Sequence, residues 1–123
     1  MVVLCAEDDV WVRQFILTVL KTDGFTVLAA GDGKAALEEA RKYSGTIDLL
    51  VSDVTMPRMG GLELRRTIAG ERPGIKVLMM SGDLAWKDQI SMMGLPFLQK
   101  PFTAKAVRES IDKLLGTCEG PFA

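Results

Sequence analysis

Short apolar runs alternate with longer amphipathic segments along this sequence, and this pattern constrains its fold more than any other feature. The runs are five or six residues long, which is the length of a buried strand. They cover residues 2–6, 25–30, 47–52, 75–80 and 95–99. After each run, apolar residues recur three or four positions apart, as on one face of a helix. The chain is therefore expected to repeat a strand–helix unit five times.

This repeat predicts an α/β fold, in which a five-stranded parallel sheet is covered by helices on both faces. Right-handed crossovers leave few strand orders, and the doubly wound, flavodoxin-like order suits a chain of 123 residues. Ligands of such sheets bind at the carboxyl ends of the strands. The residues that follow the strands therefore decide what the chain can do.

Length and charge fit one domain, which we place at residues 1–116, with 117–123 as a tail, linker or expression remnant. A net charge of −1 gives no reason to expect direct nucleic-acid binding, and no apolar stretch is long enough for a membrane span. Cys5 lies in an apolar run and Cys118 at the other end, so we expect no disulfide and a reducing, cytoplasmic location. The absence of histidine excludes histidine-based catalysis and zinc sites within the chain.

Charged and hydroxyl side chains follow four of the expected strands. They are Glu7, Asp8 and Asp9 after the first, Asp53 after the third, Ser81 after the fourth and Lys100 after the fifth. Singly, each has an ordinary structural explanation: an acidic residue there usually caps a helix, as we expect of Asp9, and a lone lysine is usually a surface charge. Because the fold brings these strand ends to one edge, the combination indicates a functional site.

Three carboxylates at one edge of a sheet need a cation. Neighbouring negative charges raise one another's pKa, and Mg²⁺ relieves this repulsion because it takes oxygen ligands. An aspartate beside such an ion can act as a nucleophile towards phosphorus. Lys100 offers a positive charge and Ser81 a hydroxyl for phosphoryl oxygens. The sequence therefore predicts phosphoryl chemistry with Mg²⁺ as the cofactor.

Four segments resemble, in order, the motifs of the receiver domains of two-component response regulators. They are the opening strand with its acidic pair (3–9), the phosphoacceptor segment (53–64), the hydroxyl motif (79–82) and the Lys-Pro-Phe ending (97–102). The resemblance extends from Val2 to about Leu115. Residues 97–103 are similar to the receivers of hybrid sensor kinases in particular.

The resemblance implies a phosphoacceptor and a metal site. Asp53 would accept a phosphoryl group from a phosphohistidine on a partner histidine kinase or histidine phosphotransfer protein. Asp8, Asp53 and the backbone carbonyl of Thr55 would bind Mg²⁺, and Glu7 would act through a metal-bound water. The domain would be regulatory rather than an enzyme, limited to its own phosphorylation and dephosphorylation.

The same resemblance implies a conformational switch. Ser81 and Lys100 would close on the phosphoryl group, and Phe97 would fill the space that Ser81 vacates. The face formed by the fourth helix, fifth strand and fifth helix would then change for an unidentified output partner. The domain would act as a monomer or as a dimer promoted by phosphorylation. The bond from Lys100 to Pro101 would be cis.

Two features depart from the family's pattern. Gly60 stands where an acidic or amide residue is common, which would soften the loop after Asp53. The segment from Met93 to Phe97 is one residue shorter than the common pattern, which affects the fourth helix and the loop after it.

Two alternative functions are open on the residues alone. A Mg²⁺-dependent phosphatase of the haloacid-dehalogenase type would need Asp-x-Asp after the first strand, but here Thr55 holds the second position and Asp53 follows the third strand. An interaction module independent of phosphorylation would keep only the fold, whereas Asp8, Ser81 and Lys100 are all present beside Asp53. We therefore expect a phosphoacceptor domain rather than either alternative.

Overall fold

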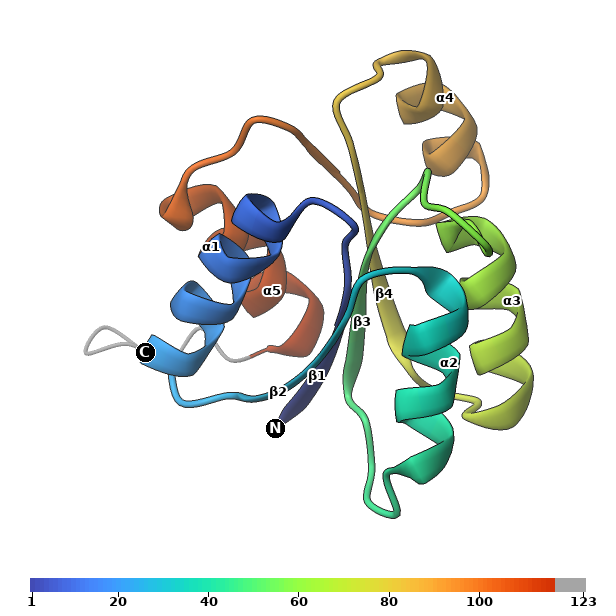
Figure 1. The fold of residues 1–123 in the computed structure, drawn as a ribbon. Coiled ribbons are helices and arrows are strands. Elements are labelled where there is room, and N and C mark those ends of the chain that lie inside the picture. Colours follow the sequence, from blue (N-terminus) through green and yellow to red (C-terminus); the bar gives the residue numbers. More distant parts are fainter. Residues whose placement is uncertain (117–123) are drawn as a thin grey trace.

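The computed structural model describes residues 1–116, in which five strands alternate with five helices (Figure 1). The elements are β1 (Val2–Ala6), α1 (Val10–Thr22), β2 (Thr26–Ala30), α2 (Gly33–Lys42), β3 (Leu49–Asp53), α3 (Gly61–Glu71), β4 (Lys76–Ser81), α4 (Ala85–Met92), β5 (Phe97–Gln99) and α5 (Ala104–Leu115). The predicted strand–helix repeat is confirmed.

The strands form one parallel sheet in the order β2-β1-β3-β4-β5. This is the doubly wound order that the sequence predicted. Figure 1 shows α1 and α5 on one face of the sheet and α2, α3 and α4 on the other. The order of strands reverses between β1 and β3, so the carboxyl ends of these two neighbours form the crevice in which such sheets bind ligands.

Each face of the sheet has its own hydrophobic core. Val3 and Cys5 of β1 pack towards α1 and α5, whereas Leu4 and Ala6 pack towards α2, α3 and α4. All four of these residues are fully buried. Successive side chains of a strand point to opposite faces, so a strand covered on both faces must be apolar at every position. This explains why the strands appear in the sequence as continuous apolar runs.

The structure corrects the predicted ends of several strands. β2 begins at Thr26, β3 extends from Leu49 to Asp53, and β4 from Lys76 to Ser81. β5 begins at Phe97 rather than at residue 95. The N–H of Leu95 donates to the carbonyl of Ile90 at 3.2 Å and so belongs to the turn after α4. Pro96 has no N–H to donate to a strand.

Two predictions about individual residues are confirmed, and others lie outside the described residues. Asp9 caps α1, since its Oδ1 accepts the N–H groups of Trp11 and Val12 at 2.9 and 3.2 Å. Cys5 is a buried free thiol. Cys118 and the predicted tail at 117–123 lie outside the described part of the chain. Within residues 1–116, every helix is too short or too polar to cross a membrane.

Arg72, directly after α3, holds the end of α2. Its guanidinium donates to the backbone carbonyls of Ala40, Tyr43 and Gly45 at 2.9, 2.6 and 2.8 Å. The last carbonyls of a helix have no partner within the helix, and a cation there also interacts favourably with the helix dipole. Arg72 therefore joins α2 to α3 at the edge of the sheet opposite the strand ends that carry the site.

Candidate functional site

Three carboxylates meet at the crevice between β1 and β3. One carboxylate oxygen from each of Glu7, Asp8 and Asp53 lies within 4.8 Å of the other two. Glu7 has no solvent exposure, Asp53 is 8% exposed, and Asp8 is exposed. Glu7 and Asp8 follow β1 directly, and Asp53 is the last residue of β3. The strand ends thus bring together the acidic residues that the sequence predicted to be neighbours.

Lys100 reaches this cluster from the loop after β5. Its ammonium lies 2.6 Å from Oε1 of Glu7 and 3.0 Å from Oδ2 of Asp53. The backbone N–H of Lys100 donates to the carbonyl of Ser81 at 2.9 Å, and the Lys100–Pro101 peptide bond is cis. One half-buried cation therefore contacts two buried carboxylates.

Burial and charge act in opposite directions on these groups. Burial raises the pKa of Glu7 above its ordinary value, although hydrogen bonds from Lys100 and from the N–H of Asp9 lower it. Burial alone would lower the pKa of Lys100, but its hydrogen bonds to Glu7 and Asp53 outweigh that effect, and the pKa is raised. The lysine is therefore held firmly in its charged form beside the acidic cluster.

The arrangement fits a hard divalent cation. The buried Oε1 of Glu7 has the ammonium of Lys100 as its neighbour at 2.6 Å, and the described part of the chain gives this oxygen no further hydrogen-bond donor. A carboxylate oxygen can accept more than one hydrogen bond, so Oε1 of Glu7 can also accept from water or from the water of a bound ion. The three acidic residues offer only oxygen ligands, which suit Mg²⁺. Together they could hold such an ion.

The other predicted site residues lie on β4, on β5 and in the loop after β3. Ser81 ends β4, is 5% exposed, and accepts the N–H of Asp83 at 3.0 Å through its Oγ. Thr55 is exposed in the loop after Asp53. Phe97 begins β5 and is half-buried against the core on the α2, α3 and α4 side.

Gly61 supports the site from behind. It is the first residue of α3, and a Cβ added to it would lie 2.1 Å from the carbonyl oxygen of Asp53 and 2.7 Å from Cε of Met79. A side chain here would displace the backbone that carries Asp53. At Gly60, the other glycine of the pair, α3 begins without a side-chain cap.

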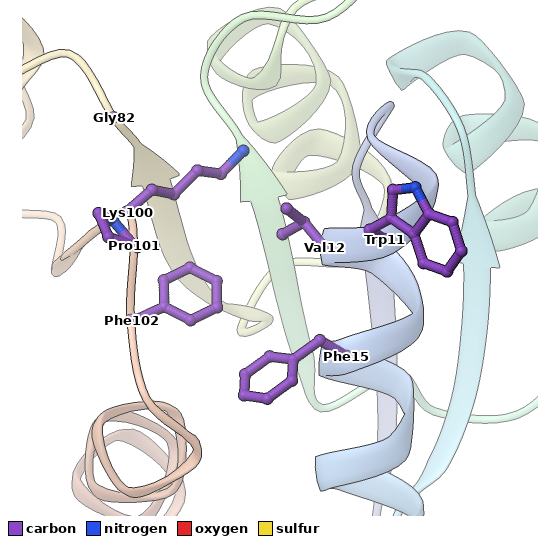
Figure 2. Close-up of a pocket in the computed structure, with 7 residues that line it drawn as sticks. All are labelled: Trp11, Val12, Phe15, Gly82, Lys100, Pro101 and Phe102. Carbon is purple, nitrogen blue, oxygen red and sulfur yellow. The ribbon is translucent and has the colours of Figure 1, made fainter.

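A groove beside Lys100 was not found by sequence reasoning. It has a volume of about 600 Å³ and is lined by Trp11, Val12, Phe15, Gly82, Lys100, Pro101 and Phe102 (Figure 2). Trp11 is 83% exposed, and the rings of Phe15 and Phe102 lie 6.2 Å apart. Trp11 lies outside the apolar face of α1. A large apolar residue at such a position is the signal in the sequence that could have indicated a binding surface. The apolar groove thus opens next to the ammonium that contacts Asp53.

The fold and the site define a doubly wound α/β domain with an acidic cluster and a lysine at its strand ends. The chain belongs to the response regulator receiver domain family, which it matches over residues 3–112. It is a phosphoacceptor signalling domain of the two-component type, and is regulatory. Receiver domains bind Mg²⁺ and interact with histidine kinases or phosphotransfer proteins.

Known relatives include free-standing receivers and parts of longer proteins. The chain is 37% identical over 127 residues to the chemotaxis protein CheY of Pseudomonas aeruginosa, covering 98% of this chain and 100% of that protein. It is 34% identical over 119 residues to the sensor kinase CckA of Brucella abortus, covering 92% of this chain but 12% of the kinase. The solved receiver domain of the hybrid histidine kinase CckA superposes with a TM-score of 0.80 at 35% identity, covering 94% and 99% of the two chains.

Proposed function

We propose that Asp53 is the phosphoacceptor of this domain. The observation that carries the proposal is the position of Lys100, whose ammonium contacts both Asp53 and the buried Glu7. A carboxylate oxygen of Asp53 would attack the phosphorus of a partner's phosphohistidine. The P–O bond forms as the P–N bond breaks, and the imidazole nitrogen leaves with the electron pair. Phosphoryl transfer requires mainly position and charge neutralisation, which the lysine supplies here.

The proposed metal ligands are Asp8, Asp53 and the backbone carbonyl of Thr55, with Glu7 acting through a metal-bound water. The closely spaced, all-oxygen donor set of Glu7, Asp8 and Asp53 supports this assignment. Bound Mg²⁺ would neutralise charge on the phosphoryl oxygens and on the clustered carboxylates. With Mg²⁺, the domain would also take phosphoryl groups from small donors and hydrolyse its own phosphoaspartate.

After transfer, Ser81 and Lys100 would bind the phosphoryl oxygens. Ser81 is buried at the end of β4, so its movement would open space that the half-buried ring of Phe97 can enter. The face of α4, β5 and α5 would then change. Met92 and Met93 at the end of α4 are 87% and 41% exposed, which would provide apolar surface for an output partner or a phosphorylation-promoted dimer.

The groove beside Lys100 would receive the phosphodonor. A partner histidine has to approach Asp53 from outside, and the groove adjoins the ammonium that contacts this carboxylate (Figure 2). Its exposed Trp11 and the ring pair of Phe15 and Phe102 suit the apolar face of a helix that bears the histidine. A cytoplasmic location is part of this proposal and agrees with the free thiol of Cys5.

The first test is intact-mass measurement after incubation with acetyl phosphate and Mg²⁺. Wild-type protein should gain one phosphoryl group, and Asp53→Asn or removal of Mg²⁺ should abolish the gain. A purified histidine phosphotransfer protein carrying phosphohistidine should transfer to wild type faster than to Trp11→Ala, while acetyl phosphate should modify both equally. If folded wild-type protein gains no phosphoryl group from either donor, the phosphoacceptor assignment is wrong.

A further inference from the structure

The loop after Asp53 contains a tight turn with strained backbone. Arg58 has a φ of +66° and is the only residue other than glycine with a positive φ within residues 1–116. The N–H of Met59 donates to the carbonyl of Pro57 at 2.7 Å, which closes a three-residue γ-turn around Arg58. γ-turns with positive φ are rare and strained, and such strain persists only where the surroundings hold it.

Asp32 holds this turn from the neighbouring loop. Nε and Nη2 of Arg58 donate to Oδ2 and Oδ1 of Asp32 at 2.9 and 3.2 Å. Asp32 is itself well fixed, because it caps α2 by accepting the N–H of Ala35 at 2.8 Å, and its side chain is 16% exposed. The planar guanidinium thus makes a two-point contact with a carboxylate that has little freedom to move.

A backbone contact lies next to this ion pair. The N–H of Gly33 donates to the carbonyl of Met59 at 3.1 Å, and a Cβ on Gly33 would lie 2.3 Å from the same oxygen. The first residue of α2 and the loop that precedes α3 are therefore in direct contact. Only a glycine at position 33 permits this approach.

The two ends of the loop that contains Thr55 are held by backbone hydrogen bonds. The N–H of Val54 donates to the carbonyl of Met80 at 2.9 Å, and the N–H of Gly61 donates to the carbonyl of Val54 at 2.8 Å. Between these points, Met56 is buried in the core, and the Arg58–Asp32 pair and the Gly33 contact hold residues 58 and 59.

We propose that Arg58 is a positioning residue for the metal site, because its pairing with Asp32 holds the strained turn and so fixes the loop that contains Thr55. This inference rests on the proposed function, which assigns the backbone carbonyl of Thr55 to the metal. It adds a specific role for two residues, Arg58 and Asp32, that are not among the proposed ligands.

Three variants separate the ion pair from the backbone strain. Arg58→Ala removes the guanidinium but leaves a residue that disfavours positive φ. Arg58→Gly also removes the guanidinium but relieves the strain, because glycine adopts positive φ freely. Asp32→Ser removes the carboxylate and keeps a good helix cap. The matched control is Arg41→Ala, because Arg41 forms a similar two-point pair with Glu71 at 3.1 and 2.7 Å, between α2 and α3 and away from the site.

Two measurements read the effect. Calorimetric titration with MgCl₂ gives the affinity for the metal alone, and hydrogen exchange of the amides at 54–60 in EDTA reports the loop without metal. We expect Arg58→Ala and Asp32→Ser to weaken Mg²⁺ binding by up to about tenfold, the lower limit for loss of a direct partner of a metal ligand, because this pair acts on Thr55 only through the backbone. Both should also speed exchange. Arg58→Gly should lose less Mg²⁺ affinity than Arg58→Ala. Arg41→Ala should have the Mg²⁺ affinity and the exchange rates of wild type.

The outcomes separate this inference from the proposed function. If wild type binds Mg²⁺ but Arg58→Ala and Asp32→Ser bind it equally well, with unchanged exchange at 54–60, the role of Arg58 is wrong and the phosphoacceptor assignment stands. If wild type does not bind Mg²⁺, the proposed metal site is wrong. If Arg58→Ala does not fold, Asp32→Ser and Arg58→Gly provide the same test.

Discussion

The ammonium of Lys100 lies 2.6 Å from Oε1 of Glu7, a side chain with no solvent exposure. The same ammonium lies 3.0 Å from Oδ2 of Asp53. In the described part of the chain, no other cationic side chain forms an ion pair with either carboxylate. One positive charge therefore lies between two negative ones at the site.

Replacing this lysine should destabilise the metal-free protein. Lys100→Met leaves two buried carboxylates without their cation, which we expect to lower the free energy of unfolding by roughly 1–3 kcal/mol in EDTA, less than for a fully buried pair because Lys100 is partly exposed. Saturating Mg²⁺ should narrow the difference, because an ion that binds the folded state stabilises it and finds a more negative cluster in the variant. Urea unfolding of wild type and Lys100→Met, in EDTA and in MgCl₂, measures the stability difference under each condition. Lys105→Met, at an exposed position, is the control. An identical loss with and without Mg²⁺ would mean that Lys100 acts by packing alone.

The same substitution at two glycines of α3 should have opposite effects. Gly61→Ala places a Cβ 2.1 Å from the carbonyl oxygen of Asp53, which should lower the free energy of unfolding by roughly 1–3 kcal/mol. Gly70→Ala meets nothing within 4 Å and should raise it by about 0.5–1 kcal/mol, because alanine favours the helix. Denaturant unfolding of both variants and of wild type measures these changes in the free energy of unfolding. A Gly61→Ala protein as stable as wild type would show that the α3 backbone can move away from Asp53.

Loss of Arg72 should loosen the end of α2. Arg72→Ala removes the donor from three backbone carbonyls, and we expect a loss of roughly 2–3 kcal/mol in the free energy of unfolding. Arg66→Ala, at an exposed position of α3, should change it by less than about 0.5 kcal/mol. Hydrogen exchange should localise the effect of Arg72→Ala to the last turn of α2. If Arg72→Ala and Arg66→Ala change the free energy of unfolding equally, Arg72 does not hold the end of α2.

The buried thiol of Cys5 gives a pH-dependent prediction. Burial, and secondarily the charge of Glu7, raise the pKa of Cys5 from 9.0 to about 12. The unfolded thiol therefore loses its proton at a lower pH than the folded thiol, so stability due to Cys5 is complete below pH 9 and falls between pH 9 and about 12. Both proteins for this test carry Cys118→Ser, and one of them also carries Cys5→Ala. The free energy of unfolding of the protein that keeps Cys5 should fall relative to that of the Cys5→Ala protein between pH 9 and about 12. At pH 8, iodoacetamide should label Cys5 only through unfolding, and rapid labelling of folded protein would contradict its burial.

Much of the fold follows from local sequence pattern, and so does the acidic cluster. The strands are continuous apolar runs because both faces of β1 are buried, and the carboxyl ends of parallel strands necessarily meet at one edge. Glu7, Asp53 and Lys100 lie close together because their strands end at that edge. The start of β5 was less predictable, because Leu95 is apolar yet serves the turn after α4.

Other features depend on tertiary contacts that leave no local pattern. Glu7 and Asp8 are adjacent and alike, yet one is fully buried and the other exposed, because neighbouring side chains point in different directions. The positive φ of Arg58 has no counterpart in its residue type, since arginine rarely adopts this conformation. The contacts that hold it come from Asp32 and Gly33, which lie far from it in the sequence.

The acidic cluster takes its first residue from the end of the first strand and its lysine from the loop after the last strand. During synthesis, Glu7 and Asp53 leave the ribosome before Lys100, since the amino-terminal part of a chain emerges first. A nascent chain that stops short of Lys100 has the carboxylates but lacks the cation between them. The ion pairs of Lys100 with Glu7 and Asp53 can therefore form only after all five strands have been synthesised.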